Sequence, residues 1–160
     1  MKRILVVQQA FGAYPRGAVV DDPDEMTRLL ASEHADKLRE TQLPSREEVE
    51  HESRERAIAQ ARAAPLADAV YQLANYNSLR RGPHRIDPFE LFADTPRAEI
   101  EDWLRRARKL LSDAWAVGDA YLSKDAPYEA IRERFLRENP GFSPATYSDA
   151  EHRGTVAALH

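Results

Sequence analysis

The residues best suited to metal chemistry lie at the start of a charged segment. Glu48 and His51 are three positions apart, so on a helix they would share a face, a spacing that di-iron bundles use for their ligands. Such sites also need a second pair of this kind and further carboxylates in a dry core. The run His51-Glu52-Ser53-Arg54-Glu55 lacks the second histidine of a zinc-protease H-E-x-x-H motif. We therefore expect Glu48 and His51 to be surface residues and assign no metal site.

Other patterns of catalytic centres are missing from the sequence. It contains no glycine-rich dinucleotide or phosphate loop and no G-x-S-x-G nucleophile turn. The chain has no cysteine, which excludes disulfides, thiolate catalysis and Cys-ligated metal sites, and favours an intracellular protein. We accordingly predict a protein that is not an enzyme and binds no cofactor.

The most concentrated positive charge is a predicted loop at residues 80–85. It contains Arg80, Arg81, His84 and Arg85, with no acidic residue between Asn75 and Ile86. Arginine forks suit phosphate or carboxylate groups, so this loop is a candidate for anion or nucleic-acid contact. The alternative, which we favour, is a solvated loop whose arginines offset the dipole at the end of the preceding helix.

The last two predicted helices could form a helix-turn-helix around Asn139-Pro140-Gly141. The second helix offers Thr146, Ser148, His152 and Arg153, but also Asp149 and Glu151. Because those two acids would repel phosphate, we favour a plain helical hairpin.

A tight turn near the N-terminus carries two aromatic residues. The segment from Phe11 to Gly17 has two glycines and a proline, and includes Tyr14 and Arg16. Exposed aromatics and arginine on a turn suit protein–protein contact, so Phe11, Tyr14 and Arg16 are candidate partner-binding residues. The aromatic pair could equally cover the core of its own segment.

Length and composition set the limits for these candidates. The chain has 160 residues, 31% of them charged, and a net charge of -4. This balance argues against a protein that coats nucleic acid, although a local basic patch would fit. No apolar run approaches the ~20 residues that span a bilayer, so we expect no membrane segment. The length predicts one domain, or one domain with a small appendage.

The first 43 residues differ from the rest of the chain. Arg3 to Gln8 and residues 18–20 have strand character, and Asp22-Pro23 begins a predicted helix to about Ser32. A short extended segment at residues 37–41 is a possible third strand. Such a β-β-α module is too small to bury a good core, so we expect it to pack against other structure.

Residues 44–64 predict a charged connector helix. Ser45 and Glu48 have the spacing of a capping box, and Val49 is the one apolar residue from Arg46 to Arg56. A helix without an apolar stripe is expected to be solvated along most of its length.

Residues 65–160 predict a helical bundle. After Pro65, apolar residues recur at helical spacing to about Leu79; a long helix follows at 96–123, a third from Asp125-Ala126-Pro127, and a last one from Ser143. Trp103 and Trp115 fall on the stripe of the long helix, so both are expected in the core. Gly118 could end the helix, bend it or permit a close crossing. The fold class is therefore α+β, mostly α.

The opening module resembles a family of short phage proteins. Phe11-Gly12-Ala13-Tyr14-Pro15-Arg16-Gly17, followed by Asp22-Pro23-Asp24-Glu25, is similar to the F-G-x-Y-x-R-G turn and D-P-x-E helix of these proteins. Tailed phages and prophages encode them among their structural genes, and their activity is unknown. The resemblance covers residues 2 to about 41, and residues 34–41 are more charged here than the third strand of the family. It implies a virion or prophage context without catalysis.

These observations predict a non-enzymatic structural or interaction protein of a phage or prophage. It would dock on a capsid or other virion protein, or on a second copy of itself, in the bacterial cytoplasm during assembly or in the virion. The alternative is a nucleic-acid-binding or regulatory protein that uses Arg80 to Arg85 and the C-terminal helical hairpin.

Overall fold

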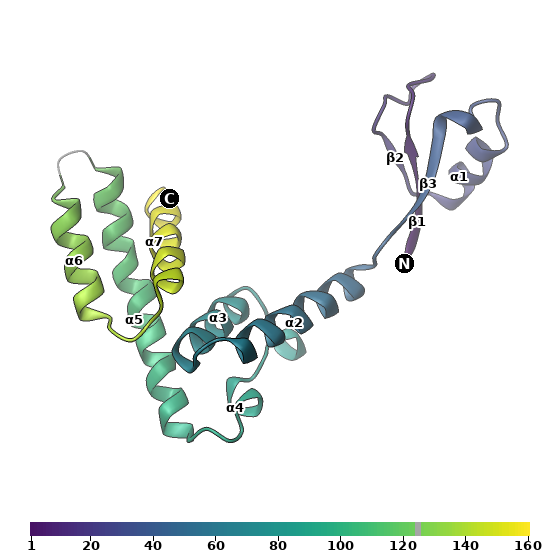
Figure 1. Cartoon of the computed structure of the whole chain (residues 1–160). Coiled ribbons are helices and arrows are strands. Elements are labelled where there is room, and N and C mark those ends of the chain that lie inside the picture. The colour runs from purple at the N-terminus through teal and green to yellow at the C-terminus, as the bar shows by residue number, and fades with distance from the viewer. Residues whose placement is uncertain (124–125) are drawn as a thin grey trace. The chain divides into compact units, whose positions relative to one another are not determined.

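The computed structural model describes residues 1–123 and 126–160 (Figure 1). They form an N-terminal unit, Met1–Ser53, and a helical unit, Arg54–His160. The first contains a small antiparallel sheet with one helix, and the second is built from helices, so the predicted mostly helical α+β class is confirmed. Acidic residues outnumber basic ones in the N-terminal unit, whereas the two are balanced in the helical unit.

Three strands form the sheet of the N-terminal unit. β1 (Lys2–Val7) lies between β2 (Val19–Val20) and β3 (Leu38–Leu43), and both pairings are antiparallel. The third strand, which the sequence left open, is therefore present. A 3₁₀ turn, Ala35–Lys37, leads into it.

Helix α1 (Pro23–Leu30) covers one face of this sheet (Figure 1). It begins as predicted, because the Asp22 carboxylate accepts the N–H of Glu25 at 2.8 Å. The core under α1 joins two strand residues to two helix residues, namely Leu5, Val20, Met26 and Leu29. A core of this size supports only a small unit.

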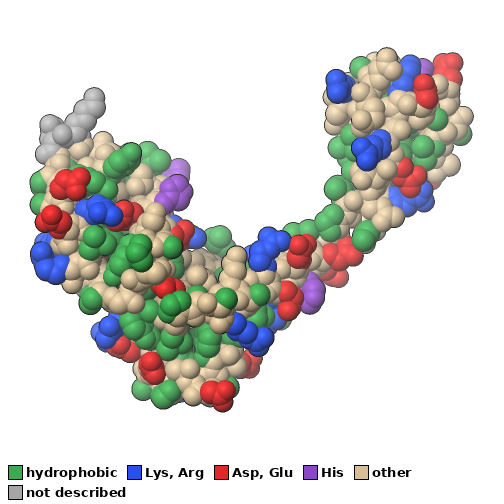
Figure 2. All heavy atoms as spheres, viewed as in Figure 1, with side chains coloured by type: hydrophobic (Ala, Val, Ile, Leu, Met, Phe, Trp, Pro, Cys, Tyr) green, Lys and Arg blue, Asp and Glu red, His purple; other side chains and the backbone are tan. Residues whose placement is uncertain are grey.

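Helix α2 (Arg46–Ala63) carries both acidic and basic side chains, most of them in its first half (Figure 2). The predicted capping box is confirmed: the N–H of Ser45 donates to Glu48 at 2.6 Å, and the N–H of Glu48 donates to Ser45 Oγ at 3.2 Å. Ala61 is the one buried residue of this fully described helix. The boundary between the two units lies inside it, between Ser53 and Arg54.

The helical unit continues from the second half of α2. Its further elements are α3 (Leu66–Ser78), a 3₁₀ turn (Gly82–His84), α4 (Pro88–Leu91), α5 (Arg97–Leu122), α6 (Tyr128–Glu138) and α7 (Pro144–Ala158). Asp125, expected at the start of α6, lies outside the described residues. Within the described ranges, no helix combines the length and the apolar character needed to cross a membrane.

Helices α5, α6 and α7 pack side by side around the main core (Figure 1). Tyr121 near the end of α5 contacts Tyr128 at the start of α6, so these two helices are antiparallel. α7 runs parallel to α5, because Trp103 lies at Gly141 and Gly118 lies at Gly154. Ala67 and Tyr71 of α3 also belong to this core. The other buried members of the core are Ala107, Leu110, Ala114, Val117, Phe135, Phe142 and Ala150.

Gly118 lies in the interior of α5 and permits a close helix crossing, which is one of the three roles the sequence left open. A Cβ atom on Gly118 would lie 2.3 Å from the backbone of Gly154 in α7. A Cβ atom on Gly154 would lie 2.0 Å from the carbonyl oxygen of Ala114. The two glycines therefore let the helix backbones touch.

The prediction that Trp115 belongs to the core is wrong. Trp115 is 50% exposed, whereas Trp103 is partly buried and packs against the core. Ala114 takes the position that faces α7, and the next residue points about 100° around the helix. The apolar stripe of α5 is thus wider than the surface that its neighbours cover.

Candidate interaction surfaces

The turn that carries Phe11 and Tyr14 is held by its own backbone. The N–H of each residue donates to the carbonyl of the other, at 3.0 and 2.8 Å, and Gly12 and Gly17 take positive φ angles of 50° and 86°. The two rings lie 5.2 Å apart and pack against the core under α1. Both rings thus cover their own unit and stay partly exposed, while Arg16 is exposed.

The hydroxyl of Tyr14 is tied to α1. It donates to the Glu25 carboxylate, and this hydrogen bond raises the pKa of Tyr14. This hydrogen bond connects the turn at residues 11–17 to α1, so Tyr14 links the turn to the helix.

The second face of the sheet has no helix of the N-terminal unit over its strands. Directly opposite residues share a face, so the pairing of Val6 with Val19, and of Lys2 with Leu43, places them on the side away from Leu5 and α1. Val19 is 56% exposed and Leu43 is 47% exposed. We call this surface the open sheet face; it includes Lys2, Val6, Val19, Arg39, Thr41 and Leu43. Ile4 lies on the same side of β1 but is buried.

The basic loop contains one anchored arginine, two exposed arginines and an exposed histidine. Arg80 donates to the carbonyl of Tyr76 at 3.0 Å and stacks over its ring at 3.6 Å, as expected of an arginine at the end of a helix. Arg81, His84 and Arg85 are exposed, and none has an ion-pair partner among the described residues. The loop therefore presents two arginines and one histidine to solvent.

Asn77 fixes the far end of this loop. Its side-chain amide donates to the carbonyl of Ile86 at 2.7 Å and accepts the N–H of Ile86 at 2.8 Å. Ile86 is buried in the small core between α2, α3 and α4. Asn77 is thus used to hold the loop backbone.

The C-terminal hairpin uses part of its polar surface internally. Thr146 is buried and donates to Asp68 of α3 at 2.7 Å, so it is not available to a partner. Asp149 accepts hydrogen bonds from Tyr71 at 2.8 Å and from Arg153 at 2.7 Å. His152 and Ser148 remain exposed.

The Glu48 carboxylate is already bonded to groups at the start of its own unit and helix. The N–H of Ser45 and the amino group of Met1, which lies 3.0 Å away, lower the pKa of Glu48 to about 2. His51 is exposed. Over the described ranges, no group of three or more carboxylate and histidine side chains is placed to hold a metal ion.

A groove lies over α3 in the helical unit. It is walled by the second half of α2 and the first half of α7, and its volume is about 830 Å³. We call it the α3 groove; its lining includes Gln60, Asp68, Tyr71, Gln72, Tyr76, Leu79, Ala145, Asp149 and Arg153.

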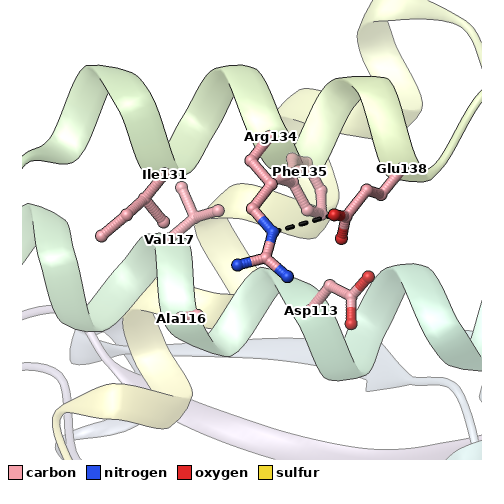
Figure 3. A pocket seen from close by; sticks show the side chains of 7 residues that line it. All are labelled: Asp113, Ala116, Val117, Ile131, Arg134, Phe135 and Glu138. Atoms are coloured by element: carbon pink, nitrogen blue, oxygen red, sulfur yellow. Dashed lines mark hydrogen bonds and ion pairs between the residues drawn. The ribbon is translucent and has the colours of Figure 1, made fainter.

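A smaller hollow of about 290 Å³ lies between α5 and α6 (Figure 3). Arg134 of α6 donates to Glu138 at 2.8 Å across its mouth, and Asp113 of α5 lies nearby. The floor is apolar and belongs to the bundle core through Val117 and Phe135. It is a shallow gap between packed helices.

Sequence reasoning did not find the open sheet face or the α3 groove. The first depends on the register of β3, whose mixed sequence L-R-E-T-Q-L does not show which residues face the helix. The second depends on how α2, α3 and α7 are placed, and only the spacing of Ala57, Gln60 and Ala64 hints at a shared side of α2. No family model matches the chain, and no curated protein or solved structure shows significant similarity to it.

Proposed function

We propose that this is a non-enzymatic interaction protein that docks on a protein partner through the open sheet face of its N-terminal unit. The single observation that carries the proposal is the exposure of Val19 and Leu43 on a sheet whose other face supplies the core. Apolar side chains grouped on one surface mark interaction sites more often than scattered ones do.

The size of the N-terminal unit supports the same function. The cluster under α1 has four buried members, and a unit this small gains substantially from burying a second apolar surface. Arg39 shares the open sheet face through its pairing with Val6, and it is exposed. A partner with an apolar surface and a neighbouring carboxylate would fit this combination.

The phage resemblance of residues 2 to about 41 suggests the kind of partner. We propose a capsid or other virion protein, or a second copy of this chain within an assembly. The bacterial cytoplasm during assembly, or the virion, is the location that such a partner implies. Phe11, Tyr14 and Arg16 would form a separate contact on the turn, because the two rings pack on the α1 side of the sheet.

Co-purification with candidate virion proteins tests this function. Leu43→Asp places a charge on the open sheet face and is expected to weaken partner binding by at least about tenfold. The matched control is Leu30→Asp, because Leu30 is 39% exposed but lies on α1. A protein that stays monomeric and binds none of the candidates, or that loses binding equally in both variants, contradicts the proposal.

A second candidate function is nucleic-acid binding through the basic loop. The observation that favours it is the exposure of Arg81, His84 and Arg85 without an acidic neighbour between Asn75 and Ile86. Gel-shift experiments with duplex DNA would show binding that weakens steeply with salt and is lost when Arg81 and Arg85 become alanine. Binding that is absent, or that does not depend on salt, rejects this candidate.

A further inference from the structure

We propose that α5 is a dimerisation helix, against which α5 of a second copy of this chain packs in antiparallel orientation. The contact surface is a row of exposed side chains along one side of α5. We call it the outer row of α5; it consists of Arg105, Arg108, Ser112, Trp115, Asp119 and Leu122. The row belongs to the helical unit alone, so the proposal does not depend on docking by the open sheet face.

The outer row has the spacing of a contact between two helices. From Arg105 to Leu122 its members follow one another at intervals that alternate between three and four residues, which places them on one side of α5. Two helices that pack along each other use this same spacing. All six side chains are exposed, and the row is about 26 Å long at 1.5 Å per residue.

Trp115 and Leu122 give the row its apolar surface. Trp115 is 50% exposed and Leu122 is 42% exposed. Large aromatic side chains gain much from burial, and tryptophan is enriched among the residues that dominate protein interfaces. A helix laid over the row would cover both side chains.

Two charged side chains of the row are left without a partner. Neither Arg108 nor Asp119 makes an ion pair or a side-chain hydrogen bond within the described residues, whereas Lys109 and Asp113 of the same helix pair with each other. About 16 Å of helix separates Arg108 from Asp119, so the two cannot pair within one chain. Each is therefore available to an opposite charge on another molecule.

These two charges select the orientation of the second copy. In a parallel pair of helices, Arg108 would face Arg108 and Asp119 would face Asp119, so like charges would repel. In an antiparallel pair, one register sets Arg108 of each copy opposite Asp119 of the other. Because the pair has twofold symmetry, this ion pair forms twice.

The same register also matches the other members of the row. Ser112 of one copy lies opposite Trp115 of the other, so a small side chain leaves room for a large one. Arg105 lies opposite Leu122, and its aliphatic stem would cover Leu122 while its guanidinium keeps its pair with Asp102 of its own helix. The row is thus complementary to itself, which favours a second copy of this chain over an unrelated partner.

Charge reversal in the intact chain tests this pairing. Sedimentation velocity at about 100 μM should show a dimer, because a contact with two large apolar residues per copy is expected to have a micromolar Kd. Asp119→Arg and Arg108→Asp each set like charges opposite each other and should raise the Kd by at least about tenfold. The double variant exchanges the two charges and should return the Kd to within about threefold of the original. Such a rescue separates loss of pairing from misfolding.

Glu133→Arg is the matched control, because Glu133 is an exposed acid of α6 outside the outer row, and the Kd should be unchanged. A chain that is monomeric at this concentration, a dimer that neither single reversal weakens, or a double variant that associates no better than the single ones would overturn the proposal. So would a dimer that is lost in Leu43→Asp but kept in Asp119→Arg, since it would form through the open sheet face. Docking of another protein on that face is measured separately by co-purification, so the two proposals can fail independently.

Discussion

A buried carboxylate fixes the start of α7 to α3. Asp68 is 5% exposed, and one of its oxygens accepts both the backbone N–H of Ser143 and the hydroxyl of Thr146. Ser143 in turn caps α7 through the N–H of Thr146, at 3.3 Å. Asp68 thus completes a cap that the sequence predicted from Ser143 and Pro144 only.

Replacing Asp68 by alanine should destabilise the helical unit by about 2–3 kcal/mol, because two buried donors lose a charged acceptor. Urea unfolding followed by circular dichroism would measure this. Asp68→Asn keeps one acceptor oxygen and should lose less. An alanine variant as stable as the original would show that Asp68 does not hold α7.

The acidic residues predict loss of stability at low pH. Burial raises the pKa of Asp149, but the hydrogen bonds from Arg153 and Tyr71 lower it more, so its pKa lies below the ordinary value. The pKa of Asp113 is also lowered: burial raises it, and the contacts with Lys109 and Asn139 outweigh that effect.

A carboxyl group with a lowered pKa in the folded state stabilises the protein above its unfolded pKa, which for aspartate is about 3.9. The unfolding free energy should therefore be steady from neutral pH to about 5 and fall as the pH drops further. Urea titrations over this range would measure it, with a shallower fall for Asp149→Asn. A stability that rises below pH 4 would contradict these ion pairs.

Three helix starts and the N-terminal turn were parts of the fold that local sequence could predict. Asp22, Ser45 and Ser143 cap the helices that they were expected to cap, because capping depends on residues three positions apart. The exposure of Trp115 and the two faces of β3 were missed. Both depend on which neighbours cover an element, which no local pattern contains.

The close crossing of α5 and α7 predicts how replacing Gly118 changes the stability of the protein. In an ordinary helix, glycine to alanine stabilises by up to about 1 kcal/mol. At this crossing a Cβ atom would lie 2.3 Å from backbone atoms of Gly154, so Gly118→Ala should instead destabilise by about 1–3 kcal/mol.

The control for this variant is Ser112→Ala, at an exposed position of α5. It should be neutral or slightly stabilising in the same chemical denaturation experiment. A stabilised Gly118→Ala variant would mean that the two helix backbones do not touch.

The two units should differ in stability because their cores differ in size. The N-terminal core rests on Leu5, Val20, Met26 and Leu29, whereas the main helical core joins residues from α3, α5, α6 and α7. Regions with fewer buried apolar contacts open more readily.

Hydrogen exchange of the intact chain, followed by mass spectrometry, would measure this difference. Amides of β1 should exchange faster than amides of α5 around Leu110 and Ala114. If the amides of β1 and of α5 exchanged with the same opening free energy, the two units would unfold as one cooperative structure. A bound partner on the open sheet face should slow exchange in β1.

Site-specific photocrosslinking in producing cells tests the docking function most directly. A photoreactive amino acid at Val19 or at Leu43 probes the open sheet face, and the same group at Asp24, an exposed residue of α1, is the control in the same unit. We predict adducts with one identified protein from positions 19 and 43 and none from position 24. Absence of adducts at 19 and 43, or equal yields at 24, would contradict docking through this face.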